Sequence, residues 1–202
     1  MSTPAQPDYE RARQYALRRL ERELSPRLLY HSLRHTRDDV LPAAERLAAL
    51  EGVDGEARLL LRTAAVYHDL GFLEQYSDNE AIAARIAAET LPGFGYSAAQ
   101  VQTVTAIIMA TKLPPSPRTL LEQIMVDADV DVLGREDFFV WSHALRDELA
   151  AHGRPTSDRE WYARQMWFLQ AHRYYTAAAR RLRGPQKDRN LASLRARLVQ
   201  LV

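Results

Sequence analysis

The sequence predicts an all-α protein, built as a single helical domain with a helical C-terminal appendage. Alternating apolar and polar runs of the kind that form strands are missing, and apolar residues recur at helical spacing throughout. Only 8 glycines occur in 202 residues, which is few for a turn-rich β protein. Because 47% of the residues are hydrophobic, the chain can bury one sizeable core and no more than one domain with an appendage.

Capping residues indicate where the first helices begin and end. Ser25 and Pro26 would supply an N-cap and the first position of a helix, and Pro42 would kink that helix. The segment Gly52–Gly55 would close it and cap the next one. We expect a flexible tail over 1–8, followed by a single domain over 9–202. The first helices of that domain are predicted over 9–23 and 26–50, and a third ends near His68-Asp69.

Three Ser-x-x-Glu/Gln sequences, beginning at Ser77, Ser97 and Ser157, have the form of a capping box, which opens a helix. A proline-rich turn over 113–117 and the pair Gly184-Pro185 interrupt the helical pattern. The predicted helices are 78–90, 98–112, 117–132, 135–152 with Gly153 as its stop, 158–183, and a short basic tail over 188–201. We expect the functional motifs to lie within about residues 25–135, and we expect residues 136–202 to form C-terminal helices.

Composition excludes several classes of function. The net charge is +1, with 27 basic and 26 acidic residues, which predicts neither a stable nucleic-acid partner nor binding to an anionic membrane. Cysteine is absent, which excludes disulfides, thiolate metal sites and cysteine nucleophiles. The N-terminus lacks a basic region followed by an apolar one, and no apolar stretch approaches the roughly 18 residues of a membrane span. We therefore expect a cytoplasmic protein.

Histidines on the predicted helices are the first candidates for a functional site. His31 and His35 are four residues apart and would share one face of a helix, roughly opposite the apolar stripe centred on Leu33. They could be metal ligands or two partly exposed histidines. His68 lies on the apolar face of its helix, where a histidine is usually a hydrogen-bonded core residue. The adjacent Asp69 favours a metal, because a buried carboxylate needs a cation or several donors.

Three aspartates close to one another are the next candidates. Asp127 and Asp131 would share a helix face, while Asp129 points nearly the opposite way. Helical periodicity does not indicate which of them is buried. Each could be a solvated or helix-capping residue, and each could be a metal ligand.

Taken together, these residues resemble the HD superfamily of metal-dependent phosphohydrolases. The pattern H…HD…D is present as His35, then His68-Asp69, then Asp129. The resemblance covers roughly residues 25–135, and the region around Glu160-Trp161 is similar to a bacterial subgroup of predicted HD phosphohydrolases. It implies an HD-type helical bundle.

The resemblance also implies a set of roles. His35, His68, Asp69 and Asp129 would bind one divalent metal ion (Mn, Fe, Co, Ni, Zn or Mg), and Asp69 would also count as catalytic. By analogy with cyclic-nucleotide phosphodiesterases, His31 would be a general acid. HD proteins with two metals carry further histidines where this chain has Asn79 and Thr111, so we expect a single metal. The substrate would be a small phosphorylated molecule such as a nucleotide, and a homodimer is left open.

Two residues are candidates for substrate binding. Lys112 could contact a phosphate or complement the dipole at the end of its helix. Glu80 could hydrogen-bond a substrate or complete the capping box with Ser77. Two alternative functions also stay open: a non-catalytic metal-containing sensing or regulatory module, and a (p)ppGpp hydrolase, which nothing in the sequence selects.

Overall fold

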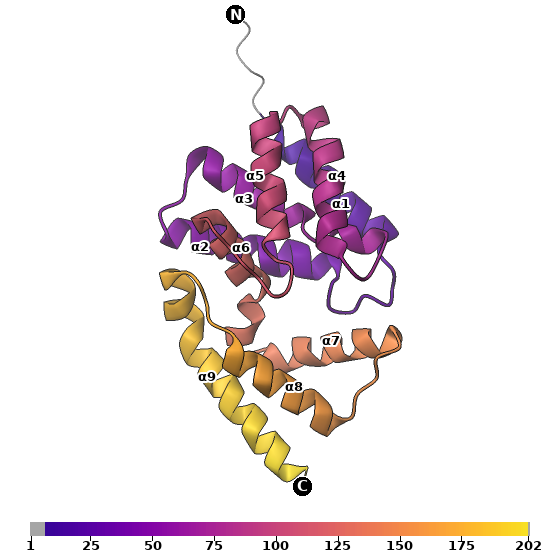
Figure 1. Cartoon of the computed structure of the whole chain (residues 1–202), viewed down its shortest axis with the longest axis vertical. Helices are drawn as coiled ribbons and strands as arrows, with labels where there is room; N and C mark the ends of the chain where they lie inside the picture. The colour runs from indigo at the N-terminus through magenta and orange to yellow at the C-terminus, as the bar shows by residue number, and fades with distance from the viewer. Residues whose placement is uncertain (1–6, 202) are drawn as a thin grey trace, which may run out of the picture.

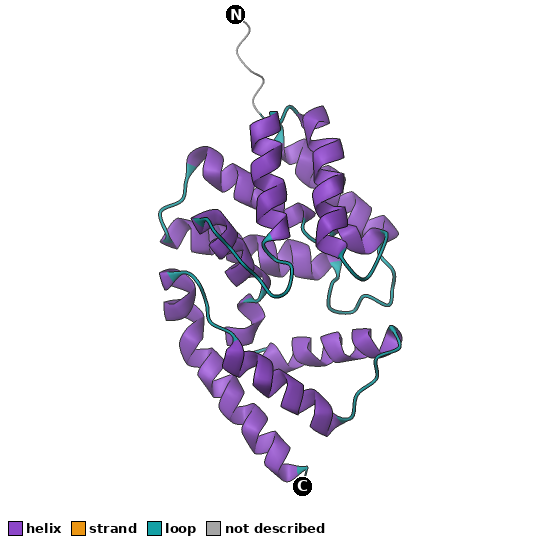
Figure 2. Ribbon diagram, in the orientation of Figure 1, coloured by secondary structure: helices purple, strands orange, loops and turns teal. Residues whose placement is uncertain are grey.

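The computed structural model describes residues 7–201, and every regular element in that range is helical, as the sequence predicts (Figures 1 and 2). No helix in the described range is long and apolar enough to cross a membrane. The helices are α1 (Tyr9–Glu23), the π-helix η1 (His35–Val40), α2 (Leu41–Leu50), α3 (Gly55–Tyr67), η2 (Leu70–Leu73), α4 (Asn79–Thr90), η3 (Leu91–Phe94), α5 (Ala98–Met109), α6 (Leu120–Asp129), η4 (Asp131–Gly134), α7 (Phe138–Ala151), α8 (Asp158–Ala171) and α9 (Ala177–Gln200).

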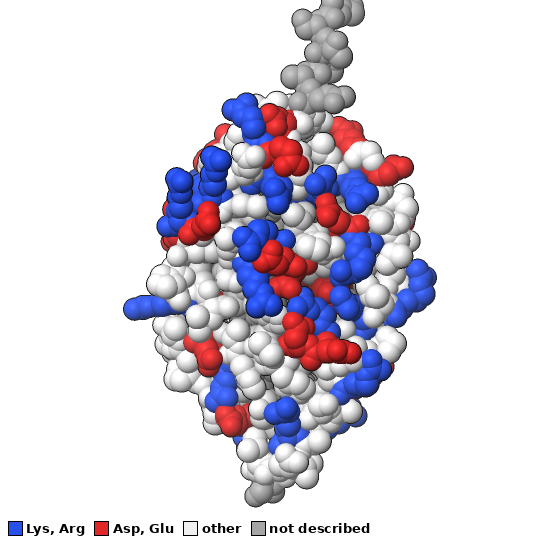
Figure 3. All heavy atoms as spheres, turned by 180° about the vertical axis from the view of Figure 1, so that it is seen from behind, with Lys and Arg blue, Asp and Glu red and all other residues white. Residues whose placement is uncertain are grey.

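Two clusters of buried side chains hold these helices together. The larger core lies among α1 to α6 and includes Leu61, Ile108 and Met125. A smaller core, with Trp161 and Leu194, joins α7, α8 and α9 below that bundle in Figure 1. The first turn of α9 belongs to the larger core, so this helix connects the two. Seen from behind, basic and acidic side chains are interspersed over the surface (Figure 3).

Several predicted boundaries agree with the structure because local signals determine them. α1 has the predicted bounds, and the Asp8 carboxylate caps it by accepting from the backbone N–H of Arg11 at 3.1 Å. The capping boxes at Ser97 and Ser157 both form. Gly153 stops the chain after α7 with a φ of +79°, which favours glycine. The predicted tail over 1–8 lies largely outside the described residues.

The predicted helix over 26–50 is wrong in its first third. Residues 24–32 form turns and bends, and helical backbone begins at residue 33, just before η1. The backbone N–H groups of Tyr30 and His31 donate to the carboxylate of Glu148 on α7, at 2.8 and 3.0 Å. Because a distant carboxylate binds these two donors, they do not join a helix. His31 and His35 consequently do not share a helix face.

The predicted capping box Ser77–Glu80 does not form. The N-cap of α4 is Asp78, in the left-handed region at φ 55°, and it makes no side-chain cap. The Ser77 hydroxyl instead accepts from the Gln75 side chain at 3.1 Å. The start of α4 is pressed against η2, since a Cβ on Gly71 would lie 1.8 Å from the carbonyl oxygen of Asn79. Packing between two elements thus overrides the local signal.

The C-terminal helices also differ from the prediction. The helix expected over 158–183 ends at Ala171, and α9 runs unbroken through Gly184-Pro185. The carboxylate of Asp127 accepts from the backbone N–H groups of Tyr175 and Thr176 and from the Thr176 hydroxyl, each at 2.8 Å. Thr176 in turn caps α9. The helix expected over 117–132 is likewise shorter, with Thr119 as its N-cap and Asp129 as its last residue.

Replacing Asp127 with alanine is expected to lower the free energy of unfolding by about 3 kcal/mol. The carboxylate is fully buried, and its removal leaves two backbone donors without an acceptor. Urea unfolding followed by circular dichroism measures the change. Asp158→Ala, at an exposed position, is the control. An unchanged transition midpoint for Asp127→Ala would show that water replaces the carboxylate.

Candidate metal centre

Three helix ends bring the predicted metal ligands together. His35 is the first residue of η1, His68 and Asp69 directly follow α3, and Asp129 is the last residue of α6. One ligand atom each from His35, His68 and Asp129 lie within 4.8 Å of one another. These three residues, 94 positions apart at the extremes, form a group that could hold a metal ion.

The two carboxylates lie against the two imidazoles. Asp129 Oδ1 is 3.2 Å from His35 Nε2 and 3.4 Å from His68 Nε2. Asp69 contacts the same nitrogens, with Oδ1 3.2 Å from His68 and Oδ2 3.8 Å from His35, although it is not one of the three residues that converge within 4.8 Å. Asp129 is the most open member, with 26% of its side chain exposed against 6% or less for the others.

Hydrogen bonding around His68 leaves atoms that a cation would satisfy. Its Nδ1 lies 2.8 Å from the carbonyl oxygen of Ala65, so this nitrogen is the donor, and in the neutral ring Nε2 presents a lone pair to the cluster. His68 Nε2 and Asp69 Oδ2 are buried and, among the described residues, have carboxylate or imidazole groups 3.2 to 3.8 Å away but no hydrogen bond of good geometry. Buried polar atoms without partners are costly, and a metal bound by both would remove that cost. The residues present therefore fit a metal ion.

The electrostatics of the cluster agree with this fit. Burial opposes the charged form of His68, but Asp69 and Asp129 outweigh it and raise the pKa of this imidazole well above its usual value. Burial likewise opposes ionisation of Asp129, and the two histidines nevertheless lower the pKa of this carboxyl. The carboxylates thus stay ionised and attract positive charge, either a proton or a metal ion.

The other two aspartates of the acidic run have structural partners. Asp127 anchors the loop before α9, as described above, and Asp131 accepts from the Arg183 guanidinium at 2.7 and 2.8 Å and from Arg46 at 3.1 Å. Both are buried. Only Asp129 reaches the histidines, a distinction that depends on α9 and that the sequence does not show.

His31 lies beside the cluster on the loop before η1. Its ring centroid is 6.0 Å from that of His35, and it stacks on Phe72 at 4.3 Å. Its Nδ1 is 2.5 Å from Glu148 Oε1. Burial lowers the pKa of His31, but the hydrogen bond to Glu148 and the charges of Asp69, Glu148 and Asp129 outweigh this effect and raise it. About 23% of the His31 side chain is exposed, so it and Asp129 are the partly open residues here.

Sequence reasoning did not find Glu148. This carboxylate is fully buried and accepts from the backbone of Tyr30 and His31, from the His31 ring and from the Tyr76 hydroxyl, the last at 3.0 Å. In the sequence Glu148 is one of two adjacent acids on α7, 117 positions from His31, with nothing to connect it to that histidine. Glu148 ties the C-terminal helices to the loop that carries His31.

The two residues suggested for substrate binding, Lys112 and Glu80, take no part in the contacts of the metal cluster or of Glu148. Lys112 forms an exposed ion pair with Asp78, with Nζ and Oδ1 2.6 Å apart. Glu80 is half-buried on α4, and its side chain makes no hydrogen bond with another described residue. Thr111, at one position where a second metal would need a histidine, uses its hydroxyl to donate to the carbonyl of Ile108.

Comparisons of the chain with models of known families, with curated proteins and with solved structures return no match. The likeness to HD phosphohydrolases therefore depends on the motif residues and on the site they form.

Proposed function

We propose that this protein is a metal-dependent phosphohydrolase that acts on a small phosphate ester such as a nucleotide. The observation that carries the proposal is the group of His35, His68 and Asp129, which converge within 4.8 Å with His68 Nε2 facing carboxylate oxygens 3.2 and 3.4 Å away. Two imidazoles with carboxylates form a mixed nitrogen and oxygen site that suits Mn, Fe, Co, Ni, Zn or Mg.

His35, His68 and Asp129 would hold the metal, with Asp69 as a fourth ligand. When bound, a divalent metal supplies Lewis acidity, neutralising phosphoryl oxygens and lowering the pKa of coordinated water. Asp129 is the partly exposed ligand, which gives the substrate an approach to the site. Because Asn79 and Thr111 occupy the positions where a second metal would need histidines, we propose one metal.

His31 would donate a proton to the leaving alkoxide. Glu148 supports this role because it fixes the ring through Nδ1 and favours the imidazolium form. The ring then presents Nε2 as the second donor. Asp69, as the fourth ligand, would also share in charge balance. Lys112 and Glu80 remain proposed phosphate and substrate contacts.

Divalent metals are expected to raise the melting temperature, and one of them should support hydrolysis. At a metal concentration 100 times the Kd, binding adds about 2.7 kcal/mol to stability, which is a shift of several degrees. Thermal unfolding with EDTA and with each metal, followed by elemental analysis, measures binding. A panel of nucleotides, cyclic nucleotides and sugar phosphates measures turnover. Protein that binds no metal and cleaves nothing on the panel would contradict the proposal.

The burial of the cluster favours one alternative, a metal-containing regulatory module without turnover. His35, His68 and Asp69 are at most 6% exposed in their side chains, as in a metal site that serves stability. In that case metal would raise the melting temperature while no phosphate ester is cleaved.

A further inference from the structure

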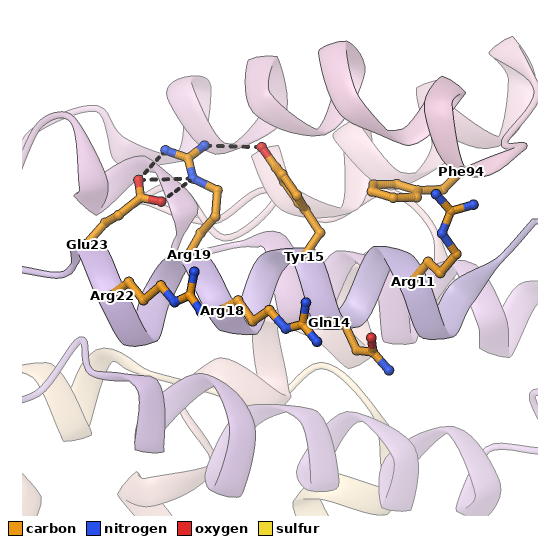
Figure 4. A pocket seen from close by; sticks show the side chains of 8 residues that line it. All are labelled: Arg11, Gln14, Tyr15, Arg18, Arg19, Arg22, Glu23 and Phe94. Carbon is orange, nitrogen blue, oxygen red and sulfur yellow. Dashed lines mark hydrogen bonds and ion pairs between the residues drawn. The ribbon is translucent and has the colours of Figure 1, made fainter.

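A surface hollow lies on α1 and shares no residue with the metal cluster. The side chains of α1 and Phe94 of η3 line a hollow of about 300 Å³ (Figure 4). Four arginines and one glutamate surround it, in a protein whose overall charge is only +1. The hollow therefore concentrates positive charge that the composition of the chain does not reveal.

The buried face of α1 determines which side chains line the hollow. Tyr9, Ala12, Ala16 and Leu20 face the core. Arg11, Tyr15, Arg18 and Arg22, at positions i, i+4, i+7 and i+11, consequently follow one another along another face of the helix. The sequence places three guanidinium groups and an aromatic ring along one line.

Two of these guanidinium groups have no partner. Arg19 already holds the one acid in the hollow, Glu23, with Nη2 2.6 Å from Oε2, and also donates to the Tyr15 hydroxyl (Figure 4). Arg18 and Arg22 form neither an ion pair nor a hydrogen bond within residues 7–201. Like charges four residues apart on a helix repel each other, and a bound anion would relieve that repulsion.

Two aromatic rings complete the hollow. The rings of Tyr15 and Phe94 have centroids 5.7 Å apart, and Tyr15 also stacks on Tyr67 at 6.4 Å, which holds it in place. The Arg11 guanidinium lies 5.7 Å from the centre of the Phe94 ring. Aromatic rings and guanidinium planes are surfaces on which a planar base stacks. The planar guanidinium group of arginine matches phosphate oxygens in geometry and charge.

We propose that this hollow binds a nucleoside phosphate, with the phosphate groups on Arg18 and Arg22 and the base against Tyr15 and Phe94. The volume lies at the lower end of the range of small-ligand sites. Because no residue of the hollow belongs to the metal cluster, this is a second binding site and does not depend on the proposed hydrolase activity.

The test is titration calorimetry of the full chain in EDTA at low salt, with ADP, adenosine and pyrophosphate as probes. ADP should bind more tightly than either fragment. In the double variant Arg18→Gln/Arg22→Gln, ADP and pyrophosphate should each bind at least about tenfold more weakly. The control Arg181→Gln/Arg195→Gln removes the same charge from exposed positions on α9 and should bind ADP like the unmodified protein.

A third variant tests the aromatic half of the site. Phe94→Leu keeps an apolar side chain and should weaken ADP binding about tenfold while pyrophosphate binding stays unchanged. ADP binding that survives the double arginine substitution would overturn the proposal, since the nucleotide would then bind elsewhere, the metal cluster included. Equal affinities for ADP and pyrophosphate would also overturn it, because the hollow would then recognise only charge.

Discussion

Replacing Asp129 with alanine is expected to remove the metal and abolish hydrolysis. Asp129 Oδ1 lies within 3.4 Å of both His35 Nε2 and His68 Nε2, so this single oxygen contacts both imidazoles. Loss of a residue that merely supports a ligand commonly weakens metal binding 10–100-fold, and we expect the loss of a direct ligand to cost more than about 100-fold. Elemental analysis after gel filtration should then find less than about one tenth of the metal in the unmodified protein.

The control for this substitution is Asp38→Ala. Asp38 lies in η1 close to His35 in sequence, is exposed, and among residues 7–201 forms its one ion pair with its neighbour Arg37. It should retain metal and activity. If Asp129→Ala keeps its metal, the ion binds elsewhere and the proposed centre is wrong. If it loses the metal and melts at a lower temperature, while the unmodified protein cleaves no phosphate ester, the regulatory module is the better account.

Replacing Glu148 with glutamine is expected to lower kcat about 100-fold and to change the pH profile. The glutamine oxygen can still accept from the backbone of Tyr30 and His31, so the loop keeps its place. The negative charge beside His31 is lost, and with it the largest of the interactions that raise the pKa of this imidazole. General acid catalysis commonly contributes a factor of about 10² to 10⁴.

The direction of the pH effect follows from the role of His31. A general acid must be protonated, so activity falls as pH rises through its pKa. Since Glu148 raises that pKa, Glu148→Gln should move the alkaline limb of the kcat profile to lower pH. Asp147→Asn, one residue away and exposed, should leave kcat and the profile unchanged. An unaltered alkaline limb in Glu148→Gln would show that His31 is not the acid.

Much of the fold could be predicted because local signals produce it. The absence of strand patterns, the capping of α1 and the capping boxes at Ser97 and Ser157 each depend on residues within one helical turn. Predicted helix boundaries are wrong where a side chain distant in the sequence accepts hydrogen bonds from backbone N–H groups. Glu148 holds the loop over 24–32 out of a helix, and Asp127 does the same before α9. Neither acceptor is near its donors in the sequence.

In the candidate site, too, some features follow from the sequence and others only from the tertiary structure. By itself the sequence determined the all-α class, and the order of His35, His68-Asp69 and Asp129 suggested a metal site through a family resemblance. Only the tertiary structure decided that Asp129 reaches the histidines while Asp127 and Asp131 have structural partners. It also decided that Glu148 holds His31. The physical reason is that a carboxylate takes its role from the donors and charges that folding brings to it, and these lie on α9 and α7, far along the chain.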